Sequence, residues 1–144
     1  MSAEQDEAVV RRFVEEVMNE GNLEAADELI APDHVNHDPT APDVPPGPEG
    51  VKQLIGMYRA AFPDIHFHTG EMFAVEGRVA HRWTFTGTHE GEMMGVEPTG
   101  KQVEVSGVEI NHVEEGRISA SWTVSDSLGL MQQLGLTPQP EDSS

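Results

Sequence analysis

The spacing of the apolar residues changes its period near residue 64, and this change constrains the fold more than any other feature of the sequence. Before residue 64, apolar residues recur every three or four positions, which is the period of a helix buried on one face. After it, the period shortens toward two, which is the period of a strand. The chain is therefore expected to place its helices first and a sheet afterwards.

Two helices are predicted at the beginning of the chain. The first runs from Glu4 to about Asn19, and its apolar stripe consists of Val10, Phe13, Val14, Val17 and Met18. Gly21 ends this helix, and Asn22 can cap a short second helix that carries Leu23, Ala26, Leu29 and Ile30.

The segment from Pro32 to Gly50 holds six of the ten prolines and is predicted to be a stiff, extended loop. Pro48 suits the first turn of a third helix, which Pro63 ends. The helical spacing in this stretch is formed by Val51, Leu54, Ile55, Tyr58 and Phe62.

Four strands are predicted after residue 64, at about 65–75, 78–88, 101–113 and 117–125. Two-residue turns at 76–77 and 115–116 each end in glycine and join neighbouring strands, and a glycine-rich loop spans 90–100. In the first strand, one face should carry His66 and His68, and the other Ile65, Phe67, Phe73 and Val75. A short helix follows, with Leu128, Met131 and Leu134.

This order predicts a single α+β domain over residues 1–144, with helices covering one face of a strongly curved antiparallel sheet. The ordered core should span about 4–136, and the polar segment 137–144 should be a frayed tail. A curved sheet closed by helices encloses a cavity, where a ligand would bind.

Composition excludes several classes of partner. The chain has a net charge of −18 and eight scattered Lys and Arg residues, so neither nucleic acid nor an anionic membrane is an expected partner. No apolar run is long enough for a membrane helix, and the first residues do not resemble a signal segment. The absence of cysteine excludes disulfides and thiolate sites. These features predict a cytoplasmic protein.

Several separated motifs resemble the SnoaL-like polyketide cyclase family, often called ester cyclases, over roughly residues 6–136. They are Asn36-His37-Asp38-Pro39, Phe62-Pro63-Asp64, Gly87-Thr88-His89-Glu90-Gly91-Glu92, Gly95, Pro98-Thr99-Gly100-Lys101, Gly116-Arg117-Ile118, Trp122, Asp126 and Leu128-Gly129-Leu130. The resemblance implies the NTF2-like cone, shared with ketosteroid isomerase. It also implies a cofactor-independent acid/base enzyme that closes a ring by intramolecular aldol chemistry.

Asp126 is the first candidate catalytic residue. On a strand, Asp126 shares an apolar face with Ile118, Ala120, Trp122 and Val124, and burial there is expected to raise the pKa of its carboxyl. The resemblance implies an acid/base role for an aspartate at this position. The alternative is that Asp126 caps the helix that follows it.

Glu109 and Asn111 are the next candidates, as catalytic residue and substrate-binding residue. A two-residue turn at 115–116 would direct both into the cavity, opposite Trp122 and Ala120. An inward Glu109 must be protonated or hydrogen-bonded, and a protonated carboxyl could donate to an enolate, as one does in ketosteroid isomerase. A three-residue turn would instead direct Val108, Ile110 and His112 inward.

Four further residues are candidates for substrate binding. Trp122 could be a cavity wall or a core tryptophan, and His37 lies in a segment that resembles the family. His89 could contact substrate or hold the loop 90–100. Arg82 lies on the same predicted strand as the Gly87-Thr88-His89 motif. The pairs His66/His68 and His34/His37 lack third and fourth ligands, so no metal site and no cofactor are expected.

The favoured function is therefore a cyclase acting on a small carbonyl-containing apolar molecule. Two alternatives share the scaffold, namely a small-molecule binding protein without turnover and a cofactor-free monooxygenase. A homodimer or higher homo-oligomer is also expected, through an outer sheet face made of small residues that include Ser119, Ser121, Thr123 and Ser125.

Overall fold

The structure is a computed structural model that describes residues 2–39, 43–93 and 95–136. The predicted tail at 137–144 lies outside these residues. The elements follow one another as α1 (Ala3–Arg12), η1 (Phe13–Asn19), η2 (Leu23–Ala25), α2 (Ala26–Leu29), β1 (Ile30–His37), α3 (Gly47–Ala61), β2 (His66–Val75), β3 (Arg78–Thr88), β4 (Gln102–Glu114), β5 (Arg117–Ser125) and α4 (Ser127–Gln133).

The first predicted helix forms over the expected length, but it changes type halfway. Ser2 and Gln5 form a capping box at its start, and α1 then passes directly into the π-helix η1. π-Helical turns often occur at functional sites. Here the wider turn presents Phe13, Val14 and Met18 to the interior cavity described below.

The proline-rich segment is not wholly a loop, because its first part forms β1. This strand lies at the edge of the sheet, parallel to β5, and its pairing is irregular between Ile30 and Val35. Pro32 falls in that irregular part, and an edge strand tolerates a residue that has no backbone N–H to donate. The sequence prediction missed β1 because the prolines masked the strand.

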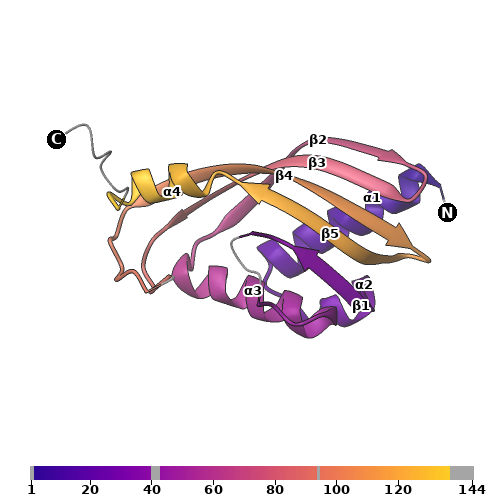
Figure 1. The fold of residues 1–144 in the computed structure, drawn as a ribbon, viewed down its shortest axis with the longest axis horizontal. Helices are drawn as coiled ribbons and strands as arrows, with labels where there is room; N and C mark the ends of the chain where they lie inside the picture. The colour runs from indigo at the N-terminus through magenta and orange to yellow at the C-terminus, as the bar shows by residue number, and fades with distance from the viewer. Residues whose placement is uncertain (1, 40–42, 94, 137–144) are drawn as a thin grey trace.

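The described strands form one sheet in the order β1-β5-β4-β3-β2. Positive φ angles at Glu76, Gly77, Glu115 and Gly116 confirm the two predicted two-residue turns. Figure 1 shows α1 and α3 on one side of the curved sheet and α4 at one end of it. The predicted α+β architecture is confirmed.

Two of the strands contain bulges that reverse which side chains point inward. In β2, the register shifts between Thr69 and Met72, so Phe73 and Val75 are exposed although Phe67 is buried. The predicted common face of these three residues is therefore wrong. In β5, Ser119 has no partner residue between the pairs Val113–Ile118 and His112–Ala120. Because side chains alternate, one extra residue exchanges the two faces of a strand.

Candidate functional site

A largely apolar cavity lies between the sheet and the helices η1 and α3. Its empty volume is about 1050 Å³, including the part that is open to solvent at its mouth. The aromatic part of its lining consists of Phe13, Tyr58, Phe67, Trp83 and Phe85. Such a lining suits a flat apolar ligand.

One wall of this cavity carries a carboxylate, Glu109 of β4. Its Oε1 accepts hydrogen bonds from His81 Nε2 at 3.1 Å and Asn111 Nδ2 at 3.0 Å, and its Oε2 accepts one from Thr123 Oγ1 at 2.7 Å. The His81 side chain is only 2% exposed, whereas Glu109 keeps 18% of its side chain exposed. Glu109 is thus held by three donors and remains reachable from the cavity that it lines.

The contacts of Glu109 determine its protonation state. Burial is the largest influence and raises the pKa of the Glu109 carboxyl. The hydrogen bond and charge interaction with His81 and the bonds from Thr123 and Asn111 together lower that pKa below its ordinary value. Of the two sequence alternatives, Glu109 is therefore hydrogen-bonded and ionised, so it can accept a proton but cannot donate one from its resting state.

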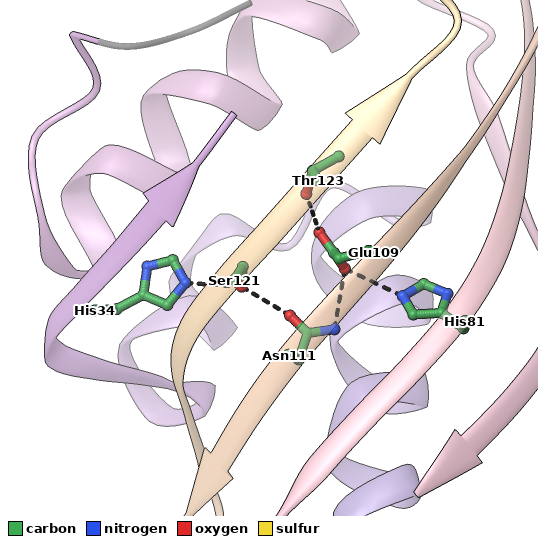
Figure 2. A network of polar contacts seen from close by, with 6 residues as sticks. All are labelled: His34, His81, Glu109, Asn111, Ser121 and Thr123. Carbon is green, nitrogen blue, oxygen red and sulfur yellow. Dashed lines mark hydrogen bonds and ion pairs between the residues drawn. The ribbon is translucent and has the colours of Figure 1, made fainter. Parts of the chain in front are cut away.

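The polar contacts continue from Asn111 to β1 (Figure 2). Ser121 Oγ donates to Asn111 Oδ1 at 2.7 Å, and His34 Nε2 lies 2.9 Å from Ser121 Oγ. Burial lowers the pKa of His34, so its imidazole is neutral at neutral pH. Asn111 points inward as predicted, but it is 2% exposed and holds Glu109 from behind the cavity surface.

The structure contradicts the prediction that Asp126 lies in the cavity. Asp126 is exposed and caps α4, where its Oδ1 accepts a hydrogen bond from Gly129 N at 2.8 Å. The bulge at Ser119 is the reason, since it turns the even-numbered residues that follow it outward. The capping alternative is therefore the one that the structure supports.

Trp122 and His37 also lie on the outer face of the sheet. Trp122 is 39% exposed, and the two rings stack with centroids 4.6 Å apart, while His112 packs on the same indole. Neither Trp122 nor His37 lines the cavity, so their predicted contact with substrate in that cavity is wrong. The bulge again explains the position of Trp122.

Arg82 and His89 do not line the cavity either. Arg82 is exposed and pairs with Glu71 at 2.7 Å. His89 is fully buried, and its Nδ1 accepts from Thr99 N at 3.2 Å. Of the two predictions for His89, the structure supports the one in which it holds the loop 90–100.

The outer sheet face carries a group of exposed hydrophobic side chains where serine and threonine were predicted. Ser121, Thr123 and Ser125 line the cavity, contrary to the prediction. The exposed large hydrophobic side chains on β1, β4 and β5 are instead Val35, Val108, Ile110, Trp122 and Val124. We refer to these five residues as the outer patch.

Sequence reasoning underrated Trp83 and missed His81, which both line the cavity from β3. A usable signal was present, because Val79, His81, Trp83 and Phe85 alternate with smaller or more polar residues. Gly107 pairs with Trp83 across the sheet, and a Cβ at position 107 would lie 2.3 Å from Trp83 Cζ2. The glycine therefore makes room for the indole.

Among the described residues, no group of three or more His, Asp or Glu side chains could hold a metal ion. In the same part of the chain, no helix is both long and apolar enough to span a membrane.

A curved sheet with helices on its inner face and a polar wall deep in an apolar cavity defines an NTF2-like protein. Residues 8–134 match the model of the SnoaL-like polyketide cyclase family, and the chain belongs to that family.

Three relatives illustrate this membership. Nogalonic acid methyl ester cyclase of Streptomyces nogalater is 28% identical over 86% of this chain and 92% of its own. IdmH of Streptomyces antibioticus, for which a polyketide cyclase activity has been proposed, is 38% identical, with a TM-score of 0.79 over 91% of this chain and 99% of its own. AclR of Streptomyces galilaeus, for which a hydroxylase activity has been proposed, is 30% identical, with a TM-score of 0.82 over 99% of this chain and 93% of its own.

Proposed function

We propose that this protein is a cofactor-independent cyclase of the cytoplasm that closes a ring in a polyketide-like ester by intramolecular aldol chemistry. The observation that carries the proposal is the ionised Glu109 in an otherwise apolar, aromatic-lined cavity. Membership of the SnoaL-like family and the likeness to nogalonic acid methyl ester cyclase support the choice of substrate class.

The base in this proposal is Oε2 of Glu109. Oε1 already accepts two hydrogen bonds, whereas Oε2 accepts one, from Thr123. A carboxylate oxygen has two lone pairs, so Oε2 keeps one for a proton on a carbon next to a carbonyl. The two bonds on Oε1 hold the carboxylate in place, so little reorganisation is needed when the proton arrives.

The proposed reaction moves one proton in a closed cycle. Glu109 takes the proton from the carbon, and the hydroxyl of Ser125, which lines the same wall, can donate to the enolate oxygen. The carbon then attacks a second carbonyl of the same molecule and forms the new C–C bond. Glu109 returns its proton to the alkoxide, and the carboxylate is ready for another cycle.

The role of His81 in this proposal is to position and polarise the base. An ionised carboxylate can only accept, so His81 Nε2 must carry the proton in the 3.1 Å contact. When Glu109 becomes neutral during the reaction, this contact weakens. The return of the proton to the product restores it, which favours completion of the cycle.

The experiment is incubation of the purified protein with nogalonic acid methyl ester in D₂O, analysed by chromatography and mass spectrometry. We expect a cyclised product of unchanged elemental composition, and with the Glu109→Gln variant a rate lower by about 10²–10⁴-fold. Deuterium at the reacting carbon of recovered substrate would show proton abstraction even where ring closure is slow. Binding without exchange or closure, for this ester and a panel of related esters, would instead support the non-catalytic alternative.

Oxygenation is the second candidate, and the likeness to AclR favours it. The same base would form the same carbanion, which would then react with O₂ rather than with a carbonyl. Repeating the incubation under ¹⁸O₂ separates the two reactions, because only oxygenation incorporates the label into the product.

A further inference from the structure

Four side chains from three strands form a row of hydrogen bonds whose direction can be worked out by counting donors and acceptors. The row runs from Glu109 through Asn111 and Ser121 to His34 (Figure 2). Glu109 is the fixed end, because a carboxylate that accepts from three donors has no proton to give. Each of the other contacts must then point toward it.

The orientation of the Asn111 amide follows first. Its Nδ2 must face Glu109 Oε1, because the opposite orientation would place two acceptors 3.0 Å apart. Asn111 Oδ1 therefore faces Ser121, whose hydroxyl has one proton and donates it there, at 2.7 Å. The Ser121 oxygen has only lone pairs left for its other neighbour.

That neighbour is His34, and it must be the donor. The 2.9 Å contact requires a proton on His34 Nε2, since Ser121 has already used its own. A neutral imidazole carries one proton, so Nδ1 of His34 is left as an acceptor. The lowered pKa of His34 agrees with the neutral form.

The unprotonated Nδ1 of His34 belongs to a side chain at the cavity wall. His34 lines the cavity although only 2% of its surface is exposed. In the described part of the protein, Nδ1 of His34 makes no hydrogen bond. Nδ1 is therefore an acceptor without a described partner, on a side chain that lines the cavity.

We propose that His34 is a specificity-determining residue whose Nδ1 accepts a hydrogen bond from a hydroxyl group of the bound molecule, a phenol or an enol. Ser121 and Asn111 are positioning residues. Their hydrogen bonds place the proton of His34 on Nε2, and they do not themselves form the proposed contact with the ligand hydroxyl. The subsite deepens the proposed function, and it rests on that function for the use of the cavity as a substrate site. A hydroxyl that has been converted to an ether cannot donate and would be discriminated against.

The tautomer can be measured without any ligand. Long-range ¹H–¹⁵N spectra of the histidine rings at pH 7.5 should show a protonated Nε2 and a bare Nδ1 for His34, with the signals assigned by their loss in His34→Phe. Ser121→Ala removes the acceptor of the Nε2 proton and should shift this ring toward a mixture of tautomers. A proton on Nδ1 in the wild type would contradict the proposal.

The subsite is tested with 1-naphthol and 2-naphthol against their methyl ethers, followed by fluorescence titration at pH 7.5. We expect at least one naphthol to bind about three- to tenfold more tightly than its ether, as one hydrogen bond between neutral groups would give. His34→Phe keeps a flat ring and should abolish this preference. His66→Phe, at an exposed position on β2, is the matched control and should retain it. Equal affinities for naphthol and ether, or no binding of either naphthol, would overturn the proposal.

Failure of the subsite and failure of the proposed function are distinguishable. A protein that prefers naphthols and shows the Nε2–H tautomer, but neither cyclises the ester nor exchanges its proton, has the subsite without the proposed reaction. A protein that cyclises the ester with equal affinity for naphthol and ether performs the reaction without the subsite.

Discussion

Replacement of Glu109 separates the chemical role of its carboxylate from its structural role. Gln has the same shape, and its amide oxygen can accept from His81 and Asn111 as Oε1 of Glu109 does. Its amide nitrogen would face Thr123, whose hydroxyl can rotate to accept. We therefore expect Glu109→Gln to remain within about 1 kcal/mol of the wild-type free energy of unfolding, because weaker hydrogen bonds are offset by the lower cost of burying a neutral group.

Glu109→Ala should behave differently because it removes all three acceptor contacts at once. Each buried donor left unpaired costs about 1–3 kcal/mol. Water from the cavity can reach this site, since 18% of the Glu109 side chain is exposed, so we take a total near the low end, about 3 kcal/mol. In a domain of this length that loss lowers the midpoint of thermal unfolding by roughly 6–12 °C.

The two variants are compared by urea unfolding and by the cyclisation assay described above. The expected pattern is a stable but inactive Gln variant beside a destabilised and inactive Ala variant. A Gln variant with wild-type turnover would refute the assignment of Glu109 as the base. An Ala variant as stable as the wild type would refute the view that this carboxylate satisfies the three donors.

Further predictions concern pH, packing, assembly and metals. Because burial lowers the pKa of His34, the unfolded chain binds a proton that the folded chain does not, so stability should fall as the pH drops below 6.5, and His34→Phe should flatten urea midpoints measured between pH 5 and 7.5. Gly107→Ala would place a Cβ 2.3 Å from Trp83 and 2.5 Å from the Val124 carbonyl oxygen, so we expect a loss of about 1–3 kcal/mol and a red-shifted Trp83 emission in a Trp122→Phe background. The outer patch should hold two copies together, so light scattering should give a dimer for the wild type and a 15.7 kDa monomer for Trp122→Asp. Exhaustive chelation should leave activity unchanged, and loss of a stoichiometric metal together with activity would refute this.

The type of most elements, but not that of β1, could be predicted from local patterns. The stripe that includes Val10 and Val17 predicted the first helix, and the turns that end at Gly77 and Gly116 fixed the pairing of neighbouring strands. The strand β1 was hidden because Pro32 disfavours an internal strand but is tolerated at an edge. Whether a strand lies at an edge is decided by the tertiary fold, so local sequence did not reveal it.

The candidate site was predictable only where side-chain alternation is unbroken. Glu109 and Asn111 point inward as expected, because the alternation along β4 itself is unbroken. Their predicted partners Trp122 and Ala120 are wrong: the bulge in β5 shifts the register, so that Glu109 pairs with Thr123 and Asn111 with Ser121. The predictions for Trp122 and Asp126 assumed that side chains alternate without interruption along β5, and the bulge at Ser119 breaks that alternation. Bulges depend on the curvature that the whole sheet adopts, and Ser119 is an ordinary strand residue with no local signal for one.

The unpaired Ser119 has a consequence for how this protein can change over evolutionary time. The bulge gives Ser121, Thr123 and Ser125 to the cavity and Trp122 and Val124 to the outer patch. Deletion of one residue there would exchange the inward and outward side chains of β5 in a single event. The cavity wall would then become hydrophobic, and the outer face would carry the hydroxyl groups. The composition of the cavity wall and that of the outer patch are thus coupled through this strand: substitutions can change them separately, but a one-residue deletion alters both.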